Sequence, residues 1–428
     1  MSVFIKNIVI NGAKKNVFVD GNKIAKIDDA KSKLDKVVDE VERKADNIID
    51  GEGLTLLPAF VDMHTHLREP GFEYKEDIAS GAAAAVAGGY ASVCCMPNTR
   101  PTIDNKYIVK YVIDRAKEVD LARVYPIGAV TVGLAGESMA EIGKLKEAGV
   151  VAVSDDGQPV STSQMMRLAL EYCKDFDMTV ISHCEDKDLV NDGVMNEGAV
   201  SCEIGLKGIP SAAEDVMISR EVILAEMLKT KVHIAHVSTK SGAQIIREAK
   251  ARGVRVTAET CPHYIAGTDE LLRGFNTLAK VNPPMRSKAD QDAIIAALVD
   301  GTIDVIATDH APHSFEEKQQ DITLAPNGIS GLETAFALCY SKLVVGGYMT
   351  LEELSKKMTV NPATILNLKK GEIVEGGLAD LVVVDLKNEF VIDSAQFVSK
   401  GKNTPFDKMR VFGKVRYTIV DGQIKFAK

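Results

Sequence analysis

The segment "LLPAFVDMHTH", residues 56–66, decides the fold, because an apolar run in it ends in two histidines. The same arrangement occurs eight times between residues 55 and 313, and a stretch of helix-forming composition follows each run. The other seven runs are "YASVCCMPN" (90–98), "ARVYPIGAV" (122–130), "GVVAVSDDG" (149–157), "MTVISHCE" (178–185), "KVHIAHVS" (231–238), "VRVTAET" (254–260) and "IDVIATDHAPH" (303–313). Short, nearly continuous apolar runs are typical of parallel strands buried on both faces. Eight such units predict an α/β fold, and specifically a TIM (β/α)8 barrel.

The two chain ends show a different pattern. Residues 1–54 and 371–428 alternate apolar and polar residues and carry turn signals such as "DGNK" and "VDGQ". Alternation of this kind predicts strands with one buried face. We expect the two ends to pair into one small β-sandwich domain, docked on a barrel domain of residues 55–370.

Composition limits the class of partner. Of the 428 residues, 46% are hydrophobic and 26% charged, with a formal net charge of -9, which argues against nucleic acid or an anionic membrane as a partner. No apolar run reaches the roughly 20 residues of a membrane span, and the first residues lack the features of a signal peptide. Seven cysteines without a CxxC pair favour a reducing compartment. We therefore expect a cytoplasmic protein that acts on a small molecule.

Histidines gather where the predicted strands end, which is the face that carries the active site of a TIM barrel. His64 and His66 are two residues apart, so on a strand they share a face and can bind one metal ion. By itself a His-x-His pair is more often an ordinary strand end. The odds change because further runs also end in residues able to bind metal, namely Asp155 and Asp156, His183, His236 and Asp309.

Four histidines and two carboxylates exceed the three protein ligands of a single catalytic zinc. The set predicts two metal ions that share a hydroxide, with Asp156 as the candidate bridge and Asp155 as the alternative. Asp309 could be a ligand, a general base or both. His233 lies three residues before His236 and so faces the other side of a strand. His263 and His310 are expected to orient ligands rather than to bind metal.

An anion-binding group is expected beside the metals. Arg68 follows the histidine pair by two residues, and its planar guanidinium can bind a carboxylate through two hydrogen bonds. Asn98 and His313 also end predicted strands and could help to hold the same anion. Each of these three residues could instead make ordinary surface contacts.

With these residues in view, the chain resembles the class I bacterial dihydroorotases of the amidohydrolase superfamily. The resemblance covers essentially the whole chain and rests on motifs in the family's order: "DMHTHLREPG", "CMPNTRP", "SDDG", "SHCED", "IAHVST", "CPHY", "VNPPMR" and "ATDHAPHSFEEK". It implies the reversible cyclisation of N-carbamoyl-L-aspartate to (S)-dihydroorotate and water, a step of pyrimidine biosynthesis. Many relatives carry a carboxylated lysine where this chain has "VAVSDDG".

The resemblance also implies roles for individual residues and two zinc ions per subunit. His64, His66 and Asp309 would bind the first zinc, Asp156 would bridge, and His183 and His236 would bind the second. Asp309 would be the general acid and base. The substrate would meet His66, Arg68, Asn98, Asn282, His313 and the backbone near Asn327 and Gly328.

Two other functions compete with this one. An allantoinase or hydantoinase would share the barrel and the metals, but a ring without a carboxylate would leave Arg68 without a partner. An inactive scaffold subunit of aspartate carbamoyltransferase would be expected to lack ligands, and here the set is complete. We expect a homodimer, and association with that transferase stays open. The polar segment "SFEEKQQDITLAPNG" (314–328) is a candidate flap over the substrate.

Overall fold

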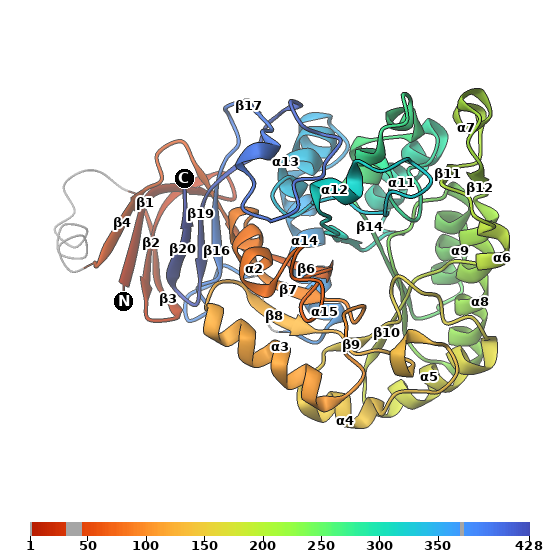
Figure 1. Ribbon diagram of the computed structural model, residues 1–428. Coiled ribbons are helices and arrows are strands. Elements are labelled where there is room, and N and C mark those ends of the chain that lie inside the picture. The colour runs from red at the N-terminus through yellow and green to blue at the C-terminus, as the bar shows by residue number, and fades with distance from the viewer. Residues whose placement is uncertain (1, 31–44, 369–371) are drawn as a thin grey trace.

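The computed structural model describes residues 2–30, 45–368 and 372–428, which form an α/β fold. The expected small domain and its boundary at 371 include residues 31–44 and 371, which lie outside the described part. Figure 1 shows a sheet built from both chain ends beside a larger body of parallel strands and helices.

The parallel strands form two hydrogen-bonded sheets, and each strand lies within one of the eight predicted runs. One sheet contains β6 (Phe60–Thr65), β7 (Tyr90–Cys95) and β8 (Arg123–Pro126). The other contains β9 (Ala152–Val153), β10 (Thr179–Ser182), β13 (Val232–Ile234), β14 (Val256–Thr260) and β15 (Val305–Ile306). Single parallel bridges, Gly128 with Val153 and Thr65 with His310, connect the two sheets at both ends of the strand order.

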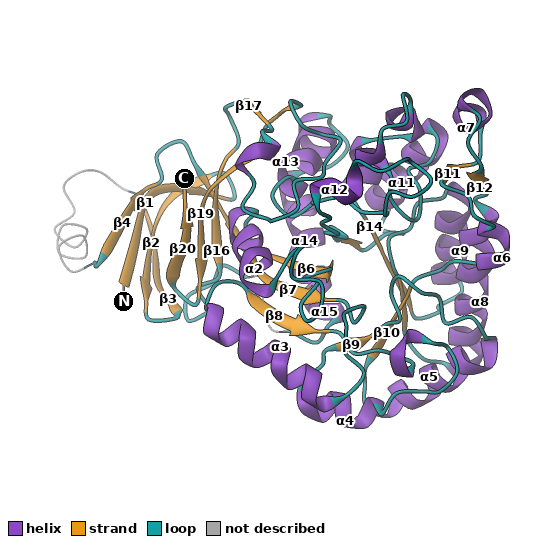
Figure 2. Cartoon of the chain, viewed as in Figure 1, coloured by secondary structure: helices purple, strands orange, loops and turns teal. Residues whose placement is uncertain are grey.

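Helices cover the outer side of these strands (Figure 2). The longer ones follow the strands in sequence: α2 (Ile78–Ala87), α3 (Lys106–Val119), α4 (Ile142–Ala148), α5 (Ser163–Asp175), α8 (Ala212–Leu228), α9 (Lys240–Ala251), α11 (Lys288–Val299), α14 (Leu351–Met358) and α15 (Val360–Ile365). Helix-forming composition at 138–149 coincides with α4, and that at 241–253 coincides with α9, which begins one residue earlier at Lys240.

Helix α5 illustrates why these segments are helical. The Thr162 side chain accepts a hydrogen bond from the Met165 amide at the start of the helix, a cap that stabilises a helix by about 1 kcal/mol. Its buried residues follow the helical repeat and turn one apolar stripe toward the strands: Met166, Ala169, Leu170 and Cys173. Apolar spacing and capping therefore fix both the start of the helix and the face that it buries.

Short elements fill the connections, and none of them was predicted. They are the pair β11 (Met195–Asn196) and β12 (Gly208–Ile209), the pair β17 (Phe390–Val391) and β18 (Arg410–Val411), and the helices α6 (Lys187–Val190), α7 (Ala199–Ile204), α10 (Pro262–Ala266), α12 (Phe315–Lys318) and α13 (Ala335–Cys339), the last continued by a π-helix over Tyr340–Val345. Elements of two to six residues are too short for a hydrophobic period to be recognised.

The two chain ends lie in one eight-stranded sheet, in the order β20-β19-β16-β5-β1-β2-β3, with β4 paired to β1. Its strands are β1 (Ser2–Ile10), β2 (Ala13–Asp20), β3 (Lys23–Asp29), β4 (Asn47–Asp50), β5 (Thr55–Pro58), β16 (Leu381–Asp385), β19 (Lys414–Val420) and β20 (Gln423–Ala427). In β16, Leu381 pairs antiparallel with Pro58 of β5, which joins the C-terminal strands to the N-terminal ones. Figure 1 shows the blue C-terminal strands beside the red N-terminal strands.

Buried side chains on both faces hold the parallel strands in place. Neighbouring residues of β7 illustrate this, because Cys94 packs into a cluster with Met63 and Ile181 of other strands, whereas Cys95 packs into the cluster beneath the helices. Both faces of β7 are therefore buried. In the described part of the chain, no helix has both the length and the apolar character needed to cross a bilayer.

Candidate metal centre and anion site

Six side chains predicted from the sequence meet at the carboxyl ends of the parallel strands. His64 lies in β6 and His66 directly follows it, whereas the other four come after β9, β10, β13 and β15: Asp156, His183, His236 and Asp309. All six are buried. Strands far apart in sequence therefore deliver their polar ends to one place.

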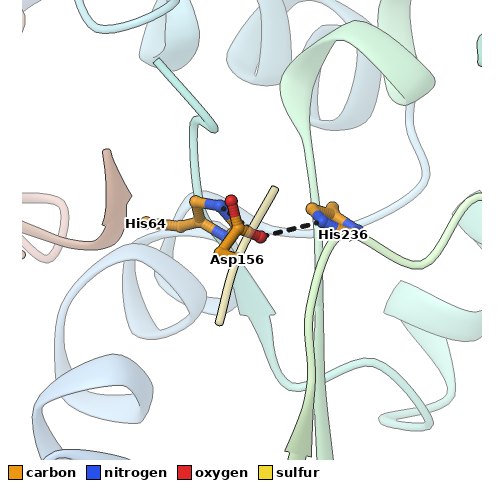
Figure 3. Close-up of side chains that lie close together, drawn as sticks. All are labelled: His64, Asp156 and His236. Atoms are coloured by element: carbon orange, nitrogen blue, oxygen red, sulfur yellow. Dashed lines mark hydrogen bonds and ion pairs between the residues drawn. The ribbon is translucent and has the colours of Figure 1, made fainter. Parts of the chain in front are cut away.

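The Asp156 carboxylate lies at the centre of this group. Its Oδ1 is 3.3 Å from His64 Nε2, 3.3 Å from His236 Nε2 and 3.5 Å from His183 Nδ1. Its Oδ2 is 3.3 Å from His66 Nε2. Figure 3 shows Asp156 directed at His236 with His64 beside it. One carboxylate thus reaches all four histidines, as a bridge between two ions would.

Asp309 occupies the side of His64 and His66. Its Oδ1 is 3.0 Å from His66 Nε2 and 3.6 Å from His64 Nε2. On the other side, His183 Nδ1 and His236 Nε2 lie 2.8 Å apart. Three groups of potential ligands can be recognised: His64, His66 and Asp309; His64, Asp156 and His236; and Cys261, His263 and Asp309.

Asp155 and Asp156 differ completely in what they contact. Asp155 Oδ1 accepts hydrogen bonds from the backbone amides of Val130, at 2.8 Å, and Thr131, at 3.0 Å, and Oδ2 accepts one from the Thr131 hydroxyl at 2.5 Å. These contacts tie the loop after β9 to the loop after β8. Of the two candidates for the bridge, only Asp156 faces the histidines.

The backbone is strained at the site. Arg68, His236 and Asp309 adopt positive φ angles of 63°, 34° and 47°, which residues with a Cβ rarely adopt. Gly328, opposite them, has a φ of 144°, and a Cβ there would lie 2.4 Å from the carbonyl oxygen of Ala311. Such strain persists where surrounding structure holds it and is frequent at functional sites.

Electrostatics at the centre favour a cation. Burial alone would lower the pKa of His64, yet Asp156 and Glu259 raise it well above its ordinary value. Burial alone would raise the pKa of Asp156, yet the surrounding histidines lower it strongly. In addition, His64 Nε2 is buried without a hydrogen-bond partner. A divalent metal ion fits these observations, because it satisfies the free nitrogen and neutralises the carboxylates.

Two amides predicted to contact substrate lie against the metal-binding residues. Asn98 Oδ1 is 2.9 Å from His66 Nδ1, so it can accept that N–H and leave Nε2 for a metal. Asn282 Nδ2 donates to Glu185 Oε1 at 2.7 Å, and Glu185 Oε2 in turn lies 3.4 Å from His183 Nε2. Asn98 therefore contacts the predicted ligand His66 directly, and Asn282 is linked to the predicted ligand His183 through Glu185.

Arg68 and His313 form a basic pair next to the metal-binding group. Arg68 Nε donates to the Pro312 carbonyl at 3.3 Å, and among the described residues no carboxylate forms an ion pair with it. His313 Nε2 lies 2.8 Å from the carbonyl oxygen of Asn327. Burial, together with the charges of Arg68 and Lys75, lowers the pKa of His313 to about 3, so this imidazole is neutral. The pair can therefore receive an anion.

The segment 314–328, expected to be a flap, is held by two buried lysines, Lys280 from outside the segment and Lys318 from within it. Lys280 Nζ donates to the carbonyls of Ile322, at 2.6 Å, and Ala325, at 2.7 Å. Lys318 Nζ donates to the carbonyl of Pro326 at 2.8 Å. The backbone that carries Asn327 and Gly328 toward the site is thus held by lysine donors.

Several residues of the site were missed by sequence reasoning. Glu259, at the end of β14, is fully buried against His64, with Oε1 2.5 Å from Nδ1. Its strand was recognised, and a carboxylate at a strand end is a signal that could have identified it. Glu185, Lys75, Lys280 and Lys318 were also passed over. His310 lies 3.3 Å from Glu76, away from the ligand nitrogens.

Comparisons with known proteins agree on one family. A model described as dihydro-orotase-like matches residues 53–242, and an amidohydrolase family model matches residues 342–426. A dihydroorotase of Acetivibrio thermocellus is 54% identical over 385 residues, covering 90% of this chain and 90% of that protein. A dihydroorotase of Geobacter sp. strain M21 is 54% identical over 378 residues, covering 88% of this chain and 89% of its own length.

Solved structures with a similar fold include an L-hydantoinase and a dihydropyrimidinase. The L-hydantoinase of Arthrobacter aurescens superposes with a TM-score of 0.84 at 25% identity, covering 99% of this chain and 95% of that one. The dihydropyrimidinase of Brevibacillus agri gives a TM-score of 0.82 at 22% identity, with the same coverage, a likeness of fold alone.

Proposed function

Because the chain belongs to the dihydroorotase family of the amidohydrolase superfamily, we propose that it interconverts N-carbamoyl-L-aspartate with (S)-dihydroorotate and water in pyrimidine biosynthesis. Its enzyme class is cyclic amide hydrolase. One observation carries the proposal: six metal-binding side chains converge beside the Arg68 guanidinium, which has a carboxylate of dihydroorotate as a natural partner.

We propose two zinc ions per subunit. His64, His66 and Asp309 would hold the first, Asp156 would bridge, and His183 and His236 would hold the second. Bound zinc would polarise the ring carbonyl and lower the pKa of the attacking water. Imidazole and carboxylate ligands suit zinc, and the contacts of Asp156 with four histidines support the bridge.

Asp309 is the proposed general acid and base. During ring opening, water adds to the carbonyl carbon, the carbon–nitrogen bond breaks, and the departing nitrogen must gain a proton. Asp309 would take that proton from the attacking water and deliver it to the nitrogen. Burial alone would raise the pKa of Asp309, but the hydrogen bond with His66 and the charge of His64 lower it strongly, so it begins as a carboxylate.

The remaining residues would orient the substrate. Arg68 would bind the carboxylate that does not react, with His313, Asn98 and Asn282 around it, and the backbone at Asn327 and Gly328 would close over the ring. His66 would also contact the substrate, because it lies against Asp309, the proposed general acid and base. Holding the ring and the attacking water together lowers the entropic part of the activation free energy of ring opening.

The test is to incubate purified protein with dihydroorotate, and separately with hydantoin and allantoin, before and after chelation and zinc restoration, while ring opening and bound metal are quantified. Opening of dihydroorotate alone, lost on chelation and restored by zinc, is the expected result. Opening of hydantoin or allantoin instead would overturn the substrate assignment. Bound metal without any turnover would point to a scaffold role.

We also propose that the eight parallel strands close into a (β/α)8 barrel and that the terminal sheet folds into a sandwich. Support for closure comes from the bridges Gly128–Val153 and Thr65–His310. Support for the sandwich comes from one cluster that joins side chains across the sheet, including Val3, Val19, Ile24, Val383 and Ile419. The proposed domains are residues 1–54 with 371–428, and residues 55–370.

Compartment and assembly are part of the proposal. All seven cysteines are free thiols, which supports the cytoplasm as the compartment. We propose a homodimer, the commonest symmetric assembly, and retain an association with aspartate carbamoyltransferase as an alternative assembly. Sedimentation of the purified protein, alone and with the transferase, would distinguish these states.

A further inference from the structure

A buried chain of polar side chains leads away from the metal centre behind His64. His64 Nδ1 lies 2.5 Å from Glu259 Oε1, and Glu259 Oε2 lies 3.3 Å from His233 Nε2. His233 Nδ1 lies 2.8 Å from the hydroxyl oxygen of Thr257. His64, Glu259 and His233 all have zero exposure to solvent. From the sequence, His233 is expected only to face the side of its strand opposite His236, and Glu259 is given no role.

Strand register places these residues next to one another. Thr257 and Glu259 are two apart in β14, so both side chains leave the same face of the strand. In the neighbouring strand β13, His233 is the register partner of Thr257. The chain of side chains therefore rests on the backbone of two paired strands.

When both imidazoles are neutral, only one arrangement of protons satisfies every contact. An ionised carboxylate accepts and cannot donate, so His64 donates Nδ1–H and His233 donates Nε2–H, both to Glu259. His233 Nδ1 then carries a lone pair and accepts the Thr257 hydroxyl proton. As a result, His64 keeps a bare Nε2, and this atom faces Asp156 at 3.3 Å and Asp309 at 3.6 Å.

We propose that Glu259 and His233 are positioning residues that fix the tautomer and ring orientation of His64 for metal binding. Glu259 would hold the ring through Nδ1, and His233 would hold Glu259 against rotation. Outer carboxylates of this kind typically change metal affinity by about 10- to 100-fold when removed. The inference rests on the proposed metal centre.

Asp62 offers a comparison within the same part of the fold. It is as deeply buried as Glu259, but its Oδ1 accepts from the backbone amides of His64, at 3.1 Å, and Thr308, at 3.2 Å, and its Oδ2 accepts from the Thr308 hydroxyl. Within the described part of the chain, its hydrogen bonds are with backbone amides and the Thr308 hydroxyl and not with a histidine ring. Loss of the Asp62 carboxylate should therefore lower the stability of the fold and have little effect on which nitrogen of His64 carries the proton.

The experiment measures zinc affinity by competition with a chromophoric chelator for the wild type, Glu259→Gln, His233→Gln and Asp62→Asn, together with the unfolding midpoint of each metal-free protein. We expect Glu259→Gln to lower zinc affinity by about 10- to 100-fold and His233→Gln by less. In Glu259→Gln and His233→Gln, kcat should fall while the KM for dihydroorotate stays unchanged. Asp62→Asn should lower the unfolding midpoint by more than Glu259→Gln does and lower zinc affinity by less.

Unchanged zinc affinity in both Glu259→Gln and His233→Gln would overturn the inference, as would a loss that merely tracks the unfolding midpoint. If Glu259→Gln does not fold, His233→Gln and Thr257→Val decide, because each removes only an outer link. The expected result is a weaker zinc site at an unchanged midpoint. Failure of the wild type itself to bind zinc would instead reject the proposed metal centre.

Discussion

The guanidinium of Arg68 and the imidazole of His313 lie side by side, with Nη2 and Nε2 3.2 Å apart. Two basic groups in contact are unfavourable unless one is neutral, and the neutral one here is His313. Among the described residues no carboxylate forms an ion pair with the guanidinium, although the charges of Asp309 and Glu317 act on it from farther away. This arrangement is suited to binding an anion.

Replacement of Arg68 by lysine should weaken substrate binding. Lysine keeps the charge but loses the planar, two-pronged donor, and hydrogen bonds to charged groups contribute about 1.5–3 kcal/mol each, which corresponds to a KM for dihydroorotate raised about 10- to 150-fold. Steady-state kinetics would measure this. The slower opening of dihydrouracil, which lacks the carboxylate, should be equal in both proteins, and an equal loss on both substrates would contradict the assignment.

Asp155 and Asp156 form a matched pair for mutation. Asp156→Asn should abolish stoichiometric zinc binding and activity, because the bridging carboxylate is lost. Asp155→Asn should retain both metals but lower the free energy of unfolding by a few kcal/mol, because about three hydrogen bonds lose their charged acceptor. Metal analysis and chemical denaturation separate the two effects. Metal loss in Asp155→Asn with retention in Asp156→Asn would reverse the assignment.

The folded protein should lose stability in mild acid through His313. Its pKa of about 3 lies below the ordinary value of 6.5, so the unfolded chain binds a proton between these values and the folded protein does not. The stabilisation is complete above pH 6.5 and is lost progressively as the pH falls toward 3. The difference in unfolding free energy between wild type and His313→Gln should therefore change across this window. A constant difference would count against a depressed pKa.

Lys318 should protect the segment 314–328 from proteolysis. Lys318→Met leaves the carbonyl of Pro326 without its donor, and we expect faster proteolysis within 314–328 and a higher KM. Lys288→Met, at an exposed site on α11, is the control and should behave like the wild type. Added dihydroorotate should slow cleavage in the wild type. Equal cleavage rates in all three proteins would show that the lysine does not fasten this segment.

Much of the site could be predicted because its signals are short-range. A strand end carrying His64 and His66, or Asp156 after an apolar run, is visible in a few consecutive residues, and parallel strands bring their ends together. Burial and register are not visible in that way. Glu259 meets His64 only because the fold brings the distant strands β14 and β6 together. Lys318 is buried although it lies in a polar stretch, which gives no sign of burial.

The pairing of β5 with β16 has a consequence for synthesis of the chain. Strand β1 leaves the ribosome long before β16, the first C-terminal strand of its sheet, which begins only at residue 381. At 5–20 residues per second, the wait is roughly 20 to 75 seconds. Throughout it, the apolar side chains of Val3, Ile5 and Val17 lack the C-terminal strands that cover them. A nascent chain of this protein should thus be a chaperone client until its last strands emerge.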